Sequence, residues 1–172
     1  MEALSYLRKP WTIPPQWVCL SIPAISAASL VAALIAQFGF GLLPCYLCLL
    51  QRGPFGLNII LGLFGAFATR FRALMICTSG GIFLINAAIA FYHSGVERKW
   101  WMGLEGCSVP DMSGSVEELI NRIQNTSVVR CDEIPWSLFG LSMANYNVAL
   151  CFGLGVFYLG YLIIRRARGL AL

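Results

Sequence analysis

The sequence predicts an all-α membrane protein: a bundle of four transmembrane helices with a long periplasmic loop. Hydrophobic residues make up 58% of the 172 positions and charged residues only 12%, a balance unusual for a soluble domain. Charged side chains are also absent from four long stretches, at residues 10–51, 53–69, 73–96 and 134–164. Because a membrane-spanning helix needs about 20 mostly apolar residues, each stretch has room for one span.

Within these stretches we expect helices at about residues 17–40, 46–67, 73–93 and 146–164. Pro10, Pro14 and Pro15 disfavour an earlier start of the first helix. That first apolar segment is too long for a signal peptide and has no small-residue cleavage pattern after it. Few residues remain outside the spans, so residues 1–172 are interpreted as a single integral membrane domain.

The positive charges predict the orientation of this domain. They lie before the first helix, between the second and third, and after the fourth, as Arg8, Lys9, Arg70, Arg72, Arg165, Arg166 and Arg168. Four spans bring these segments to one side, and the positive-inside rule makes that side the cytoplasm, with both termini. The net charge of +4, distributed in this way, indicates a membrane and no nucleic-acid partner.

The long loop, about residues 94–145, lies on the opposite side in this topology. Its segment 115–124 has apolar residues at helical spacing and a capping-box pattern between Ser115 and Glu118, which predicts a short amphipathic helix. Such a helix could lie on the membrane surface or on the top of the bundle. The apolar run 134–143 is too short to span and is typical of a segment at headgroup level.

Seven cysteines are distributed unevenly over this topology. Cys19, Cys77 and Cys151 fall inside predicted helices, where a lone cysteine usually acts as a small hydrophobic residue. The other four, Cys45, Cys48, Cys107 and Cys131, all map to the extracytoplasmic side. That compartment permits disulfides, so these four are the candidate functional residues.

Cys45 and Cys48 form a Cys-x-x-Cys motif at the start of the second predicted helix, directly after Pro44. The helix macrodipole favours a thiolate at this position, and the thiolate is the form that exchanges with disulfides. The alternative is a structural disulfide. It would close so short a loop that it would restrain little unfolded-chain entropy. We therefore favour a redox role for this pair.

Cys107 and Cys131 are separated by 23 residues and could form an ordinary structural disulfide. Beside a redox-active Cys-x-x-Cys, they could instead relay electrons by thiol–disulfide exchange. A zinc site is disfavoured because typical structural sites use two close pairs, and we expect no metal. Covalent haem attachment is excluded, because Leu49 follows the motif where a histidine is required.

Arg52 stands four residues after Cys48 and thus on the same helix face. It could extend towards lipid headgroups, or it could donate hydrogen bonds to an oxygen-bearing electron acceptor such as a quinone. His93, at the outward end of the third predicted helix, could assist at the same height or have no specific role.

The sequence resembles the disulfide-bond formation protein B family, the bacterial inner-membrane thiol–quinone oxidoreductases. The resemblance rests on four features, namely Pro44-Cys-Tyr-Leu-Cys-Leu-Leu-Gln-Arg52, Tyr92-His93, the loop pair Cys107 and Cys131, and Cys131-Asp-Glu-Ile-Pro-Trp-Ser-Leu-Phe-Gly-Leu-Ser-Met143. It extends over nearly the whole chain in order and topology.

The resemblance implies a multi-pass protein of the bacterial inner membrane that re-oxidises a periplasmic thioredoxin-fold disulfide oxidase. It implies that Cys107 forms the mixed disulfide with this partner and that Cys131 links Cys107 to Cys45. By the same resemblance, Cys48 faces a quinone, either ubiquinone or menaquinone.

Arg52 and His93 match residues that hold or lie near that quinone. Gln51 departs from family members with an acidic residue there, which leaves a general or a dedicated partner open. Two other functions compete with this interpretation. A membrane scaffold with structural disulfides is one. A vitamin K epoxide reductase-like enzyme is the other, although there the Cys-x-x-Cys opens the last helix.

Overall fold

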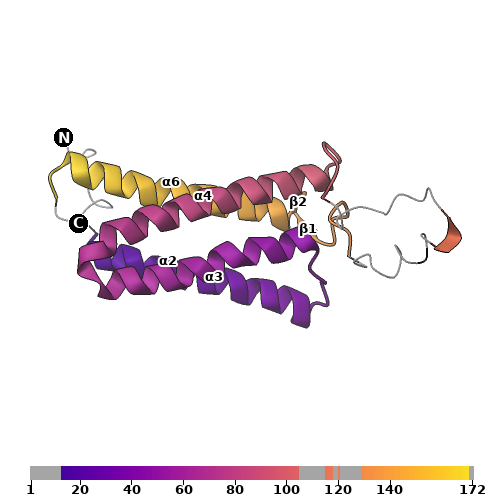
Figure 1. Cartoon of the computed structure of the whole chain (residues 1–172), viewed down its shortest axis with the longest axis horizontal. Coiled ribbons are helices and arrows are strands. Elements are labelled where there is room, and N and C mark those ends of the chain that lie inside the picture. Colours follow the sequence, from indigo (N-terminus) through magenta and orange to yellow (C-terminus); the bar gives the residue numbers. More distant parts are fainter. Residues whose placement is uncertain (1–12, 105–114, 118–119, 121–128, 171–172) are drawn as a thin grey trace.

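The computed structural model describes residues 13–104, 115–117, 120 and 129–170, and its core is a bundle of four long helices (Figure 1). Their bounds are Pro15–Leu34 for α2, which η2 continues as a π-helix over Ile35–Gly39, then Tyr46–Phe67 for α3, Arg72–Glu97 for α4 and Met143–Ala167 for α6. All four are long and apolar enough to cross a membrane. The predicted fold class, a four-helix membrane bundle, is therefore confirmed.

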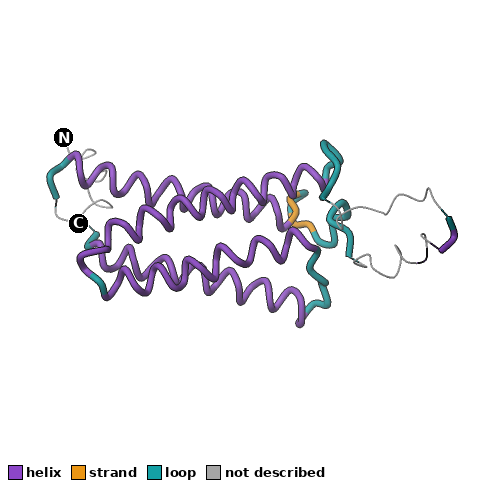
Figure 2. Tube along the Cα trace, viewed as in Figure 1, coloured by secondary structure: helices purple, strands orange, loops and turns teal. Residues whose placement is uncertain are grey.

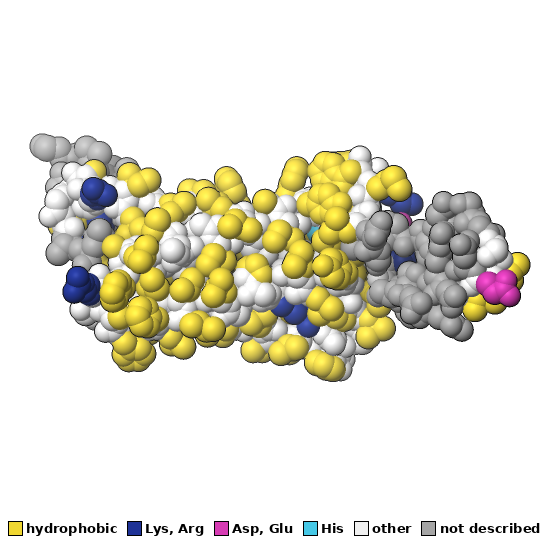
Figure 3. All heavy atoms as spheres, viewed as in Figure 1, with side chains coloured by type: hydrophobic (Ala, Val, Ile, Leu, Met, Phe, Trp, Pro, Cys, Tyr) yellow, Lys and Arg dark blue, Asp and Glu magenta, His cyan; other side chains and the backbone are white. Residues whose placement is uncertain are grey.

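The helices pack in chain order, α2 against α3, α3 against α4 and α4 against α6 (Figure 2). Hydrophobic side chains cover most of the visible bundle surface (Figure 3). Large apolar residues such as Phe38 and Phe67 are 77% and 82% exposed. An exterior of this kind suits lipid, because burial in the bilayer replaces burial inside the protein.

Glycines allow close helix contact at two places. A Cβ atom on Gly62 of α3 would lie 2.4 Å from Pro23 Cδ of α2, and one on Gly155 of α6 would lie 2.5 Å from Leu84 Cδ2 of α4. Helices in lipid associate largely through such close packing of small residues. The two glycines therefore set the spacing of α2 with α3 and of α4 with α6.

The predicted limits of α3 agree with the structure, whereas α4 and α6 are longer than predicted. α4 continues past His93 to Glu97 and closes where Lys99 adopts a left-handed conformation (φ 59°). There the Lys99 and Trp100 amides donate to the Val96 and Gly95 carbonyls, as in a Schellman motif. His93 thus lies inside a helix rather than at its end.

Two short strands, β1 (Ser137–Leu138) and β2 (Leu141–Ser142), form an antiparallel hairpin just before α6. Its two turn residues, Phe139 and Gly140, both have positive φ, as a type I′ turn requires. Ser142 then caps α6 by accepting from the Asn145 amide, so that the helix begins at Met143, three residues before the predicted start. The run 134–143, expected at headgroup level, therefore contains a hairpin. Of the predicted loop helix, residues 116, 117 and 120 are helical and the remainder lies outside the described residues.

The short connection η3 (Thr69–Phe71) joins α3 to α4 at the other end of the bundle. Arg72 donates to the Gly65 and Ala66 carbonyls, which the end of α3 leaves without helical partners. Nearby, Tyr161 Oη and Arg165 Nη1 both donate to the Ile13 carbonyl. At this end of the bundle, side chains of Arg72, Tyr161 and Arg165 therefore stabilise the connections by donating to backbone carbonyls.

Candidate dithiol redox site

The site is built on the first turn of α3. Cys45 is the N-cap residue, and its sulfur accepts a hydrogen bond from the Cys48 amide at 3.4 Å. A cap of this type normally uses Ser, Thr, Asp or Asn, so a thiol here combines a structural and a reactive role. The two Sγ atoms lie 3.2 Å apart, in hydrogen-bond contact and beyond the roughly 2.05 Å of a disulfide.

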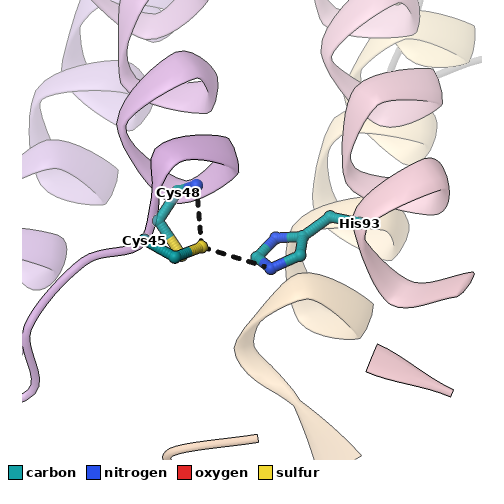
Figure 4. A group of neighbouring side chains, drawn as sticks. All are labelled: Cys45, Cys48 and His93. Carbon is teal, nitrogen blue, oxygen red and sulfur yellow. Dashed lines mark hydrogen bonds between the residues drawn. The ribbon is translucent and has the colours of Figure 1, made fainter. Parts of the chain in front are cut away.

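His93 reaches this pair from the neighbouring helix α4 (Figure 4). Its Nε2 atom lies 3.5 Å from Cys45 Sγ, and the residue is only 4% exposed. Glu97, in the part of α4 beyond its predicted end, lies 3.9 Å from the same Nε2 atom. The structure therefore brings Cys45, Cys48 and His93 together.

The two thiols are not equivalent in this arrangement. The hydrogen bond that Cys45 donates to Cys48, together with burial, raises the pKa of the Cys45 thiol to about 12. These effects outweigh the opposing hydrogen bond from His93. In the reduced pair Cys45 therefore donates to Cys48, and the expected preference for a thiolate at this position stays a prediction.

Cys131 from the long loop lies against the same pair. It is fully buried in a cluster with Cys45, Leu47 and Val96, and Cys48 packs against that cluster. Next to Cys131 within the loop, Arg130 donates to both carboxylate oxygens of Asp132 at 2.9 and 2.6 Å. This ion pair lowers the pKa of Asp132. Three of the four candidate cysteines thus meet, and Cys107 lies outside the described residues.

A cavity of about 610 Å³ opens beside the dithiol. Most of its lining is apolar and comes from α2, α3 and α6, while its polar lining includes Cys48, Arg52, His93 and Glu97. Arg52 is partly exposed, and its Nη1 donates to Gln37 Oε1 at 2.8 Å. Gln37 belongs to the π-helical end of α2, an irregularity frequent at functional sites. Cys48 and Arg52 line the same cavity, as expected from their i,i+4 spacing.

Glu97 belongs to the site but was assigned to the loop from sequence. It is 8% exposed, its Oε1 lies 3.9 Å from His93 Nε2, and Ser142 Oγ donates to its Oε2 at 2.5 Å. The i,i+4 spacing from His93 was the available signal, because that spacing puts both side chains on one helix face.

Gln51 and Asn147 also belong to the site and were not predicted from sequence. Gln51 Nε2 lies 3.0 Å from His93 Nδ1, and Asn147 Nδ2 donates to Gln51 Oε1 at 2.5 Å. An uncharged amide in an apolar helix gives little signal on its own. Their role is visible only once α3, α4 and α6 are packed together.

The same atoms could coordinate a thiophilic metal ion. One ligand atom each from Cys45, Cys48 and His93 lies within 4.8 Å of the others. The sequence-based expectation of no metal weighed the four cysteines without the histidine, and it stays a prediction.

The three remaining cysteines differ from one another. Cys19 is fully buried among apolar residues, as expected for a small hydrophobic residue. Cys77 is exposed on the bundle surface rather than buried. Cys151 is fully buried but hydrogen-bonded, donating to Asn147 Oδ1 at 3.1 Å and accepting from Asn86 Nδ2 at 3.5 Å. The apolar interpretation is therefore incomplete for Cys151.

Comparison with known proteins gives a consistent result. Residues 15–160 match the family model described as Disulfide bond formation protein DsbB. A protein of Azoarcus sp. (strain BH72) named Disulfide bond formation protein B is 29% identical over 87% of this chain and 93% of its own. A protein of the same name from Actinobacillus pleuropneumoniae serotype 5b (strain L20) is 27% identical over 94% of this chain and 90% of its own.

Proposed function

Since this chain belongs to the DsbB family of disulfide bond formation proteins, we propose that it is a dithiol:quinone oxidoreductase. In this proposal it re-oxidises a periplasmic thioredoxin-fold disulfide oxidase and passes the electrons to a quinone of the bacterial inner membrane. The family supports the coarser function, disulfide bond formation in a multi-pass membrane protein. The proposal adds to this coarser function the quinone as electron acceptor and the thioredoxin-fold oxidase as partner.

One observation carries the proposal: the Cys45–Cys48 dithiol lines an apolar cavity that also contains an arginine. Within the pair, Cys45 is 4% exposed while Cys48 is partly exposed. Cys48 is therefore the sulfur more accessible to an acceptor in the cavity. A structural disulfide would need neither the cavity nor the arginine.

The cavity fits a quinone in size and chemistry. Its volume of about 610 Å³ lies in the usual range for small-molecule sites, roughly 300–1,000 Å³. Arg52, which donates to Gln37, would donate to one ring oxygen of the quinone. His93 also lines the cavity and contacts Cys45. A bound quinone supplies an acceptor for two electrons and two protons.

The cysteines of this chain would pass two electrons from the partner dithiol to the acceptor in three steps. The partner dithiol reduces the Cys107–Cys131 disulfide through a mixed disulfide on Cys107. Cys131, whose cluster Cys45 shares, then attacks the Cys45–Cys48 disulfide at Cys45 and releases the Cys48 thiol. Cys107 resolves the Cys131–Cys45 disulfide, which restores the Cys107–Cys131 disulfide and leaves Cys45–Cys48 as a dithiol. Finally the Cys45–Cys48 dithiol closes to a disulfide and releases two electrons and two protons to the acceptor. The sum is one dithiol oxidised and one quinone reduced.

The proposed orientation puts the dithiol end in the periplasm. The arginines at η3 and at the end of α6 then face the cytoplasm, in agreement with the positive-inside rule. A membrane-impermeant maleimide applied to intact cells should label a cysteine introduced at Phe139, which is 91% exposed at the hairpin turn. Labelling of Arg168→Cys instead of Phe139→Cys would show the opposite orientation and contradict the proposal.

The experiment that tests the proposal uses purified protein in detergent, a reduced thioredoxin-fold oxidase and quinone. Quinone absorbance should fall continuously with the wild type and should not change with Cys48→Ala, because no acceptor-facing thiol remains. Cys77→Ser is the matched control, since Cys77 lies on the bundle surface outside the site. Full turnover by Cys48→Ala would overturn the quinone assignment.

A further inference from the structure

Three helices contribute to a line of side-chain hydrogen bonds that ends at the dithiol. Asn86 Nδ2 of α4 donates to Cys151 Sγ, and the Cys151 thiol donates to Asn147 Oδ1 on α6. Asn147 Nδ2 then donates to Gln51 Oε1 on α3. Gln51 contacts His93 Nδ1, and His93 Nε2 contacts Cys45 Sγ. We call these side chains, from Asn86 to Cys45, the polar chain.

The orientation of Gln51 is fixed by a backbone group. Gln51 Nε2 lies 3.1 Å from the Leu47 carbonyl oxygen, which can only accept a hydrogen bond. Rotating the amide by half a turn would put Oε1 against that carbonyl and leave two acceptors in contact. Gln51 is 6% exposed, so water would not relieve this repulsion. Gln51 therefore presents its nitrogen to His93.

An amide nitrogen only donates, so His93 Nδ1 must accept and carries no proton. In a neutral imidazole the proton then lies on Nε2, the atom that faces Cys45 Sγ at 3.5 Å and Glu97 Oε1 at 3.9 Å. We infer that Gln51 and Asn147 are positioning residues that hold His93 as the Nε2–H tautomer, a hydrogen-bond donor towards the dithiol.

Every hydrogen bond of the polar chain runs in the same direction, from the bundle interior to Cys45. Aligned hydrogen bonds polarise one another, and the effect is larger where water is excluded. The chain thus favours negative charge at its end, on a thiol sulfur or on an acceptor oxygen beside it. His93 would stabilise that charge as a donor, and it does not remove the thiol proton as a base.

This catalytic consequence rests on the proposed function, whereas the tautomer does not. The competing explanation is that the amides only join three helices, as polar groups often do in membranes. That explanation predicts loss of stability on mutation but assigns no tautomer to His93. A direct measurement of the imidazole protons separates the two.

The chain contains a single histidine, so ¹⁵N-labelled histidine gives an unambiguous spectrum of the full-length protein in detergent. At neutral pH, couplings between the ring nitrogens and ring protons should identify Nε2 as the protonated nitrogen, in the reduced protein without quinone. In Gln51→Glu the new carboxylate accepts from Nδ1–H, so the proton should move to Nδ1. A wild-type spectrum with the proton on Nδ1 would overturn the inference, even if no variant folded.

Gln37→Glu is the matched control, because it adds the same charge near the cavity without any hydrogen bond to His93. Its tautomer should remain Nε2–H, and a change there would mean that charge alone controls the imidazole. Turnover of Gln51→Glu should fall about tenfold or more, as expected for loss of one hydrogen bond to a charged group. The expected tautomer in a protein that reduces no quinone would contradict the proposed function and leave this inference intact.

Discussion

Buried polar side chains are hydrogen-bonded at the dithiol end of the bundle, whereas Asn58 in the middle is not, within the part of the chain that the structure describes. At the dithiol end, the polar chain and the Glu97–Ser142 pair connect α3, α4 and α6 by hydrogen bonds. In the middle, Asn58 is fully buried, and neither its amide oxygen nor its nitrogen has a partner among the described residues. Glycines bring the helices together there instead. Hydrogen bonds thus orient reactive groups at one end, while packing holds the remainder.

The largest effect is expected where packing alone holds two helices. Gly62→Leu inserts a side chain where even a Cβ would lie 2.4 Å from Pro23. It should cost about 3 kcal/mol or more of unfolding free energy, measured by denaturant titration in detergent. Gly56→Leu is the control, because its Cβ would meet nothing within 4 Å. Equal stability of the two variants would contradict the claim that close packing at Gly62 holds α2 against α3.

Arg52 offers the next test, at the cavity. Arg52→Met removes the donor that faces the proposed acceptor and should raise the KM for quinone about thirtyfold, in the range for hydrogen bonds to charged groups. Exchange of thiols between the partner and the loop cysteines should stay unchanged. Arg168→Met, at the opposite end, should alter neither quantity. A slower thiol exchange with the partner, at an unchanged KM for quinone, would contradict a role of Arg52 in quinone binding.

A matched pair of asparagine substitutions compares the polar chain with the middle of the bundle. Asn58→Leu replaces an unpartnered amide by an apolar group and should stabilise the bundle by about 1 kcal/mol. Asn147→Leu leaves Gln51 Oε1 and the Cys151 thiol without their partner and should destabilise it by about 1–3 kcal/mol. Opposite signs in the same unfolding assay support the comparison, and equal signs contradict it.

The smallest effect concerns the loop that carries Cys131. Because Arg130 lowers the pKa of Asp132 below the usual value of 3.8, the pair stabilises the loop above that pH. The contribution is lost as the pH falls through the lowered value. The rate at which Cys131 is alkylated, divided by the rate for a free thiol at the same pH, should therefore rise about twofold to threefold in acid, as expected for a partly exposed pair. Asp132→Asn should abolish this pH dependence. A rise that persists in Asp132→Asn would assign it to another group.

The helices and the Cys-x-x-Cys motif were predictable because each depends on local composition. Charge-free stretches gave all four spans, and the α3 limits agree at both ends. The other boundaries were missed for tertiary reasons. Glu97 stays helical because Ser142, 45 residues away, donates to its carboxylate. Ser142 in turn caps α6 through the Asn145 amide.

The site itself was only half predictable. Cysteine and arginine are rare enough in a membrane segment to be noticed singly, so the dithiol and Arg52 could be selected from sequence. Gln51 and Asn147 are separated by 96 positions along the chain, and only the packing of α3 against α6 joins them. The directional hydrogen bonds that orient His93 therefore emerge from the fold.

The central claim is that the Cys45–Cys48 pair alone delivers electrons to a quinone. Its most direct test is a single turnover with Cys107→Ser and Cys131→Ser combined, which removes both loop cysteines. The reduced variant is mixed anaerobically with quinone in detergent, and the products are quantified by absorbance and by mass spectrometry of peptides. We predict one quinol and one Cys45–Cys48 disulfide per protein. Unreduced quinone with the dithiol intact would contradict the account.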